Sequence, residues 1–320
     1  MIKILIAGIG GVGGYFGGLL AKEFQDSETV AVNFLARGEH LRAIEQNGLT
    51  IRKGDKELVA HPAKVTDQVK DLGEMDYVII CTKSYDLDDV IRQLSPCINK
   101  DTIIIPLLNG VDNRQRIETL LPENVVCDGC VYIVSRLSQP GVIHHSGKLE
   151  DLYFGLNGAE SKGLLYLAKL FAQAGIHATL TKDILTTVWE KFIFLAPIAT
   201  ATSYYNKSIG ILWAKEESRK TIEELVDEAI QLASLKNIEL ANDIKERTLH
   251  KIASLPFENT TSMHNDFKSG KGKTEIESLT GYVIKEGFQM KVVFPVFDRL
   301  YNVLIKDRNG NKYRILNPGV

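Results

Sequence analysis

The sequence predicts an α/β protein in which a doubly wound parallel sheet is followed by an all-helical C-terminal domain. Three observations support this fold class. Short apolar runs alternate with helical segments in the first half, a glycine-rich turn follows the first run, and strand-like runs stop near residue 180. Because 320 residues suit two domains better than one, we place the domains at residues 1–180 and 181–320.

The first half contains continuous apolar runs, each of which is followed by a turn or a helical pattern. Such runs are typical of strands buried on both faces, and their alternation with helices predicts a parallel sheet. The expected strands are Lys3–Ala7, Val30–Leu35, Tyr77–Cys81 and Thr102–Leu108, and the expected helices cover 12–24, 86–94 and 112–121. Further strands between Val125 and Phe154, a helix over 164–174 and a strand at His177–Leu180 would complete this domain.

The second half is helical in pattern throughout. We expect a boundary near Thr181 and no strand beyond it. The predicted helices are Asp183–Ser203, Ser218–Lys236, Ala241–Ser254, Glu275–Gly287 and Val296–Lys306.

Composition excludes several classes of function. The formal net charge of −2 gives no basic footprint for nucleic acid and no polybasic patch for a membrane surface. The longest charge-free apolar stretch, Phe192–Asn206, is shorter than a membrane span. Cys127 and Cys130 have CxxC spacing, but there is no second pair to complete a zinc site. We therefore expect a cytoplasmic protein without a metal.

The turn after the first expected strand is Gly8-Ile-Gly10-Gly11-Val12-Gly13. A GxGxxG pattern between a strand and a helix is typical of a Rossmann-type dinucleotide site. Gly8 would permit the tight turn, Gly10 the approach of the pyrophosphate, and Gly13 close packing of the helix, whose N-terminus faces the phosphates. We assign Gly8, Gly10, Gly11, Val12 and Gly13 to the cofactor site; the alternative is a glycine-rich turn without a ligand.

The cofactor predicted from the second strand is NADP(H). NAD-binding proteins usually place an acidic residue at the end of this strand, but here the strand is followed by Ala36 and Arg37. A guanidinium at that place suits a 2′-phosphate. The alternative is that Arg37 is a solvated loop residue.

Two polar residues follow the later strands of the first domain. Lys83 follows the third expected strand, and Asn109 follows the fourth. The carboxyl ends of parallel strands border the cofactor crevice, so Lys83 could attract an anionic group and Asn109 could hydrogen-bond near the nicotinamide. The alternative for Asn109-Gly110 is a plain turn.

Lys191 is the clearest candidate for proton transfer. Glu190 and Lys191 are the only charges in an otherwise apolar helical stretch, and Lys191 shares a face with Ile184, Val188 and Leu195. A lysine desolvated in this way is a plausible proton donor. The alternative is a lysine that snorkels to solvent and pairs with Glu190 or another acid.

Two later segments offer groups for a substrate. Thr274-Glu-Ile-Glu277 has the pattern of a capping box, which would leave Glu275 to hold a substrate hydroxyl or simply to favour the helix dipole. Asn259 and Ser262 could bind a carboxylate, or their segment could be an N-cap cluster for a short helix to Phe267.

Taken together and in this order, these motifs resemble the ketopantoate reductase (2-dehydropantoate 2-reductase) family over nearly the whole chain. The resemblance implies hydride transfer from NADP(H) to the C2 ketone of ketopantoate, which yields pantoate for pantothenate and coenzyme A biosynthesis. It implies that Lys191 is the general acid, that Glu275 binds the substrate hydroxyl and that Ser262 binds the substrate carboxylate. Lys83 and Asn109 match positions that support the cofactor and the reacting group.

Three positions depart from the family pattern and leave alternatives open. Leu195 and Ala199 stand where some members have asparagines, and Asp86 stands where a glutamine is frequent. Another branched 2-keto acid is therefore an alternative substrate. Another two-domain dehydrogenase and a non-catalytic NADP(H)-sensing module are the alternative functions. A homodimer formed through the helical domain is also left open.

Overall fold

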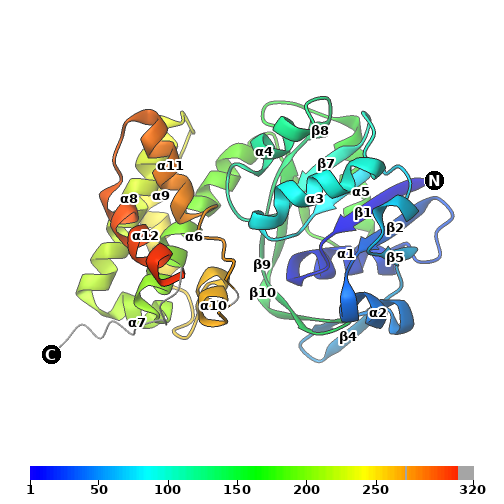
Figure 1. Cartoon of the computed structure of the whole chain (residues 1–320), viewed down its shortest axis with the longest axis horizontal. Coiled ribbons are helices and arrows are strands. Elements are labelled where there is room, and N and C mark those ends of the chain that lie inside the picture. Colours follow the sequence, from blue (N-terminus) through cyan, green and yellow to red (C-terminus); the bar gives the residue numbers. More distant parts are fainter. Residues whose placement is uncertain (271, 309–320) are drawn as a thin grey trace. The chain divides into compact units, whose positions relative to one another are not determined.

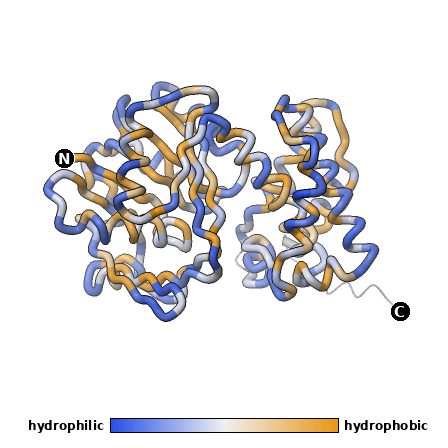
Figure 2. Tube along the Cα trace, turned by 180° about the vertical axis from the view of Figure 1, so that it is seen from behind, coloured by the Kyte–Doolittle hydropathy of each residue, from blue (hydrophilic) through white to orange (hydrophobic). Residues whose placement is uncertain are grey.

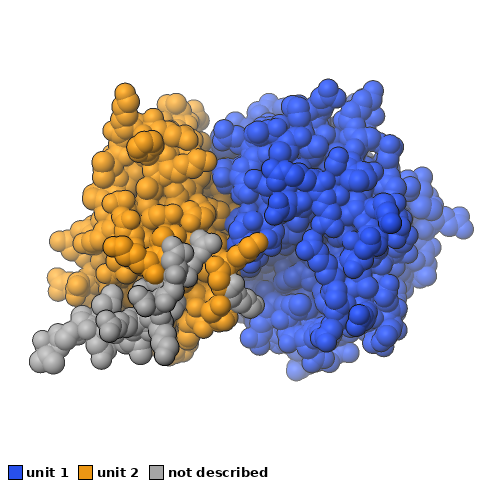
Figure 3. Space-filling model, viewed as in Figure 1, with its two compact units in different colours: residues 1–108, 112–187 blue, residues 109–111, 188–320 orange. Residues whose placement is uncertain are grey.

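The computed structural model describes residues 1–270 and 272–308, which form two compact units (Figure 3). Unit 1 comprises Met1–Leu108 and Asp112–Thr187, and unit 2 comprises Asn109–Val111 and Val188–Val320. The division after Thr187 lies inside helix α6 (Ile184–Tyr205), a few residues beyond the boundary expected near Thr181. The segment 109–111 belongs to unit 2, although unit 1 supplies the chain on both sides of it.

Unit 1 contains the predicted parallel sheet, with strand order β5-β2-β1-β6-β7-β8 (Figure 1). Every pairing in it is parallel, and Ile6 lies opposite Phe34 and Ile79, as expected for strands buried on both faces. The strands are β1 (Ile2–Ala7), β2 (Val30–Leu35), β5 (Lys64–Thr66), β6 (Tyr77–Ile80), β7 (Ile103–Pro106) and β8 (Val125–Val126). Its helices are α1 (Gly11–Glu23), α2 (Gly38–Asn47), α3 (Leu87–Leu94), α4 (Asn113–Leu120) and α5 (Lys162–Gln173), with short 3-10 turns η1 (Val69–Asp71), η2 (Ser84–Asp86) and η3 (Ser95–Cys97).

A second sheet in unit 1 was not predicted. The segment from Val125 to Phe154 does contain strands, but β9 and β10 within it pair mainly with each other instead of extending the parallel sheet, and β10 also pairs with β3 and β11. The order is β11-β10-β3-β4, and β9 pairs with β10 in a long antiparallel ribbon. The strands are β3 (Leu49–Lys53), β4 (Lys56–Ala60), β9 (Asp128–Gln139), β10 (Val142–Gly155) and β11 (Ala178–Leu180).

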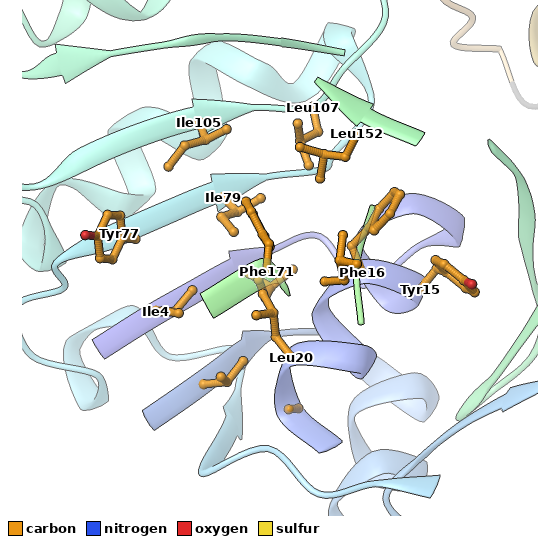
Figure 4. Close-up of a cluster of buried hydrophobic side chains, with 14 of the residues drawn as sticks. Ile4, Tyr15, Phe16, Leu20, Tyr77, Ile79, Ile105, Leu107, Leu152 and Phe171 are labelled. Atoms are coloured by element: carbon orange, nitrogen blue, oxygen red, sulfur yellow. The ribbon is translucent and has the colours of Figure 1, made fainter. Parts of the chain in front are cut away.

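Helix α1 packs against both sheets, and its glycines make this possible. A Cβ atom on Gly17 would lie 2.9 Å from Ile6 of β1, and one on Gly14 would lie 2.5 Å from Ile143 of β10. Small residues on two faces therefore let one helix approach two sheets closely. The core around α1 is shown in Figure 4 and includes Phe16, Leu20, Ile79, Leu152 and Phe171. Figure 2 shows hydrophobic segments concentrated along the strands of this unit.

Unit 2 is helical in its described part, without a strand, as predicted. Its helices are α6, α7 (Ile209–Ala214), α8 (Glu216–Leu235), α9 (Ile244–Ala253), α10 (Ser262–Lys268), α11 (Thr280–Met290) and α12 (Pro295–Arg308). Among the helices of residues 1–270 and 272–308, α6 alone is long and apolar enough to span a membrane. The charge-free stretch Phe192–Asn206 was too short to predict this, because the helix also includes Glu190 and Lys191. Most of α6 is buried inside the protein, with Ile193 and Ala196 fully inaccessible.

The predicted capping box at Thr274 is wrong. The helix begins at Thr280, not at Glu275, and its N-cap position is Leu279. Thr274 Oγ1 accepts the nearby Ile276 N–H, at 3.4 Å, within a turn. The carboxylate of Glu277 instead accepts hydrogen bonds from the Tyr301 hydroxyl of α12 at 3.0 and 3.2 Å. A tertiary partner has thus replaced the local one.

Candidate active site

The glycine turn of unit 1 has the stereochemistry of a phosphate-binding loop. Gly8 has φ +97°, which disfavours any side chain, and a Cβ atom on Gly13 would lie 2.1 Å from the Gly8 carbonyl oxygen. A Cβ atom on Gly10, in contrast, would meet nothing within 4 Å. The turn therefore leaves open space beside Gly10 at the start of α1, where a dinucleotide pyrophosphate fits. The Val12 side chain packs against the core, so only its backbone faces the turn.

Gly11 is needed for a reason that the motif did not reveal. A Cβ atom there would lie 2.1 Å from the carbonyl oxygen of Ser135 in β9. The β9–β10 ribbon therefore crosses the first residue of α1. No local pattern could have shown this contact, because it depends on the unpredicted second sheet.

His40 of α2 holds the glycine turn to the same ribbon and was also missed. Its Nδ1 accepts the Gly141 N–H at 2.8 Å, so the ring proton is on Nε2, which donates to the Ile9 carbonyl at 2.8 Å. Burial lowers the pKa of His40, which favours this neutral form. The imidazole thus fixes the backbone between Gly8 and Gly10.

Arg37 and Lys83 lie where the sequence placed them in the parallel sheet. Arg37 follows the end of β2 at the N-cap position of α2, is exposed, and donates to Gln93 Oε1 at 2.8 Å. Lys83 follows the end of β6 and precedes η2. Both are therefore at the carboxyl edge of the sheet, where cofactors bind in folds of this type.

Asn109 and Lys191 are brought together in unit 2. Lys191 Nζ, on α6, donates a hydrogen bond to Asn109 Oδ1 at 2.9 Å, across 82 positions of sequence. Gly110 has φ +103°, and the chain bends at Asn109 and Gly110. The hydrogen bond joins this bend to helix α6.

The neighbour of Lys191 has a different partner. Glu190 forms an ion pair with Arg247 of α9, with 2.6 Å between Oε1 and Nη2. Glu190 therefore has a partner of its own on α9. Lys191 is half-buried, between the buried Val188 and the partly buried Leu195 on the face that the helical spacing predicted.

Ser262 and Glu275 form the second polar pair of unit 2. Ser262 Oγ, at the first residue of α10, donates to Glu275 Oε2 at 3.2 Å. Glu275 is only 3% exposed and lies in the turn that precedes α11. Thr261 is the N-cap of α10 and accepts the His264 N–H, so the N-cap interpretation holds for Thr261. Asn259 lies in the preceding loop, where its carbonyl accepts the Ile209 N–H at 2.8 Å.

Two polar contacts attach α10 to α6. The Thr202 and Thr261 hydroxyls are 3.0 Å apart, and His264 Nε2 lies 2.8 Å from Asn206 Oδ1. Since an amide oxygen only accepts, Nε2 carries the proton. Burial lowers the pKa of His264 to about 4. These contacts fix the position of Ser262, and nothing in the local sequence pairs His264 with Asn206.

We expect the stability of the protein to fall between pH 6.5 and about 4 partly because of His264. Unfolded histidine takes up a proton near its ordinary pKa of 6.5, whereas folded His264 resists protonation until about pH 4. Folding is therefore favoured most above pH 6.5, and this residue alone would contribute roughly 3 kcal/mol to the loss. The melting temperature of His264→Gln should depend less on pH than that of the wild type. An equally steep decline in the variant would contradict this assignment.

The cysteines of the CxxC motif and His145, which metal or redox chemistry would use, lie in the interior of unit 1. Cys127 and Cys130 are buried free thiols, and burial raises the pKa of Cys127 to about 12. His145 is buried and stacks on Tyr15, with 4.7 Å between ring centroids. Within residues 1–270 and 272–308, no group of three His, Cys, Asp or Glu side chains is placed to hold a metal ion.

The fold and these residues define a class of enzyme, the pyridine-nucleotide-dependent oxidoreductases. Two family models match: Ketopantoate reductase PanE/ApbA over residues 4–159, and Ketopantoate reductase PanE/ApbA C terminal over residues 183–307. The chain belongs to the ketopantoate reductase family.

Relatives with known names cover almost the whole chain. It is 27% identical to the uncharacterized oxidoreductase YkpB of Bacillus subtilis, with 94% of this chain and 97% of that protein covered. It is 26% identical to the 2-dehydropantoate 2-reductase of Halobacterium salinarum, with 97% and 100% covered. The structure of 2-dehydropantoate 2-reductase from Porphyromonas gingivalis is 34% identical, with a TM-score of 0.84 and 95% and 99% covered.

Two more distant structures share the fold. One is a D-mandelate dehydrogenase with NADH and anilino(oxo)acetate, which is 23% identical, with a TM-score of 0.84 and 96% and 99% covered. The other is a dimeric ketopantoate reductase from Staphylococcus aureus, which is 19% identical, with a TM-score of 0.77 and 96% and 99% covered. The fold alone thus accommodates more than one substrate.

Proposed function

We propose that this protein reduces ketopantoate to pantoate with NADPH. The observation that carries the proposal is the hydrogen bond of 2.9 Å from the Lys191 ammonium to the Asn109 amide oxygen. Lys191 lies on α6, a helix whose only other charge is Glu190. Reduction of the C2 ketone develops an alkoxide, which needs a cation and a proton donor close to it. Lys191 supplies both, and Asn109 orients the ammonium by accepting one of its hydrogens.

The second polar pair, Ser262 and Glu275, provides partners for the hydroxyl and the carboxylate of the substrate. Glu275 is a buried acceptor, which suits the hydroxyl of ketopantoate. The single hydrogen of Ser262 Oγ goes to Glu275 in this structure, and it would turn to the substrate carboxylate when the substrate hydroxyl takes its place at Glu275. Asn259, in the loop before α10, is the further group that we assign to substrate binding. A carbonyl group, a carboxylate and a hydroxyl thus each have a matching partner in unit 2.

The cofactor assigned to unit 1 is NADPH, which supplies the hydride when bound. Gly8, Gly10, Gly11 and Val12 would line its pyrophosphate, with Gly13 allowing the close helix packing. Arg37 would bind the 2′-phosphate, because its exposed guanidinium lies just beyond the end of β2. Lys83 and Asn109 would support the nicotinamide side.

Arg37 should select the cofactor. We expect Arg37→Ala to weaken NADPH binding by about tenfold or more and to leave NADH binding nearly unchanged, because only NADPH carries the 2′-phosphate. Arg37→Lys should retain part of the preference. Titration of nucleotide fluorescence measures both affinities, and an equal change for NADH and NADPH would show that Arg37 has another role.

The experiment that tests the whole proposal is NADPH oxidation with ketopantoate, run beside 2-ketoisovalerate and with NADH as the alternative cofactor. Turnover preferring ketopantoate and NADPH is the expected result. Activity on 2-ketoisovalerate alone would favour the alternative of another branched 2-keto acid. Binding of NADPH without turnover of any keto acid would favour a sensing module.

The alternative substrate has one structural observation in its favour. Leu195 is partly exposed one turn from Lys191, whereas Ala199 is fully buried. Of the two positions where some family members have asparagines, Leu195 is therefore the one that can present an apolar surface to a substrate. We further propose cytoplasmic action and a homodimer, the latter by analogy with the dimeric relative.

A further inference from the structure

Two buried hydroxyls beside the glycine turn make no hydrogen bond to any other described residue. They are Thr82 Oγ1 and Ser135 Oγ. Buried hydroxyls normally have a partner, since leaving one unsatisfied destabilises the folded state. Both residues belong to unit 1, and neither was part of the predicted site.

The two hydroxyl-bearing residues contact opposite ends of the turn. The Thr82 Cγ2 methyl lies 2.8 Å from the position of a Cβ atom on Gly8. The Ser135 carbonyl oxygen lies 2.1 Å from the corresponding position on Gly11. Between these contacts is Gly10, whose Cβ position has open space for at least 4 Å. A residue with an unsatisfied hydroxyl thus contacts the turn on each side of Gly10, Thr82 through its methyl group and Ser135 through its backbone.

The strand periodicity directs Ser135 toward α1. Side chains alternate along a strand, so Ser135 shares a face of β9 with Val131 and Ile133. Both of these pack in the core that includes α1, whereas Val134 on the other face is 60% exposed. The Ser135 hydroxyl is therefore on the inner face, beside the start of the helix.

We propose that Thr82 and Ser135 donate hydrogen bonds to the phosphate oxygens of the bound dinucleotide. Phosphate oxygens are acceptors only, and hydrogen bonds from hydroxyls to anions are among the stronger ones in proteins. In this structure both hydroxyl oxygens are inaccessible to solvent, so each side chain turns toward the phosphate as the dinucleotide binds. The inference rests on the dinucleotide of the proposed function and is independent of the keto acid.

The test uses two variants that remove the hydroxyl and retain the shape. Thr82→Val keeps a methyl group against Gly8, and Ser135→Ala keeps the backbone contact with Gly11. Each should weaken NADP⁺ binding by about tenfold. The melting temperature of the nucleotide-free protein should stay the same or rise, because an unsatisfied polar group has been removed.

Ser138→Ala is the matched control on the same strand. The Ser138 hydroxyl donates to the Val142 carbonyl at 3.0 Å. Its removal should lower the melting temperature slightly and leave NADP⁺ affinity unchanged. The test variants should lose NADP⁺ affinity without losing thermal stability, whereas the control should lose a little thermal stability without losing NADP⁺ affinity. This difference distinguishes a ligand contact from a structural one.

A nicotinamide-free ligand locates the contact. Affinity for 2′-phospho-ADP-ribose, which retains the pyrophosphate, should fall by the same factor as affinity for NADP⁺. Three results would overturn the proposal: affinities within about twofold of the wild type, a loss confined to NADP⁺, or a lowered melting temperature in the nucleotide-free variants. Normal NADP⁺ binding without ketopantoate turnover would count against the proposed reaction only.

Discussion

Lys191→Ala should lower kcat for ketopantoate reduction by ~10²–10⁴-fold, because the developing alkoxide would lose its proton donor and its nearby positive charge. The affinity for NADPH should change little, since nucleotide binding is assigned to the glycine turn, Arg37 and Lys83, and Lys191 is assigned to proton transfer. Steady-state kinetics and a nucleotide titration on the same preparation measure the two quantities.

Lys251→Ala is a suitable control for this variant. The Lys251 ammonium also packs on α6, 4.5 Å from the centroid of the Phe194 ring, and it is not among the residues assigned to the chemistry. It should retain wild-type kcat. Lys191→Arg should recover little activity, because arginine keeps the charge but is a very weak acid. A near-wild-type kcat/KM for Lys191→Ala would show that Lys191 is not the general acid.

Glu275→Gln should have the second largest effect and should reveal which substrate the site fits. With ketopantoate, kcat/KM should fall by roughly 10–100-fold, because a charged acceptor for the substrate hydroxyl is lost. With 2-ketoisovalerate, which lacks that hydroxyl, the decrease should be only a few-fold. The difference between the two substrates isolates the contact from any general damage.

Glu277→Gln is the matched control for Glu275. Glu277 is exposed, lies two residues away and binds Tyr301. The Glu277→Gln variant should keep the wild-type kcat/KM for both substrates, with at most a small loss of stability. Equal losses for ketopantoate and 2-ketoisovalerate in Glu275→Gln would mean that this carboxylate positions Ser262 and does not bind the substrate hydroxyl.

Several of the structural predictions depended only on local physics, and these were confirmed. The continuous apolar runs identified β1, β2, β6 and β7 because strands buried on both faces must be apolar throughout. The glycine turn was identifiable because Gly8 requires a left-handed backbone and Gly13 has no room for a side chain. The helices of the second half were also predictable, because the spacing of apolar residues follows from the 3.6-residue turn of the helix itself.

The predictions that failed involved competition between a local and a distant partner. Thr274 and Glu277 have the spacing of a capping box, but Glu277 binds Tyr301 of α12, and the helix starts later. The partner of Glu190, which the sequence left open, is likewise distant: its carboxylate pairs with Arg247. Local spacing shows which contacts are available, whereas the packing of the whole domain decides which one forms.

The sequence by itself determined the fold class, the family and the types of residue available for chemistry. Only the tertiary structure decided that β10 pairs with β3, that Ser135 and His40 contact the glycine turn, and that Asn109 accepts a hydrogen bond from Lys191. Periodicity and backbone stereochemistry act over a few residues and can be recognised in the sequence. A pairing across 82 positions depends on how every intervening element packs, and no local pattern encodes it.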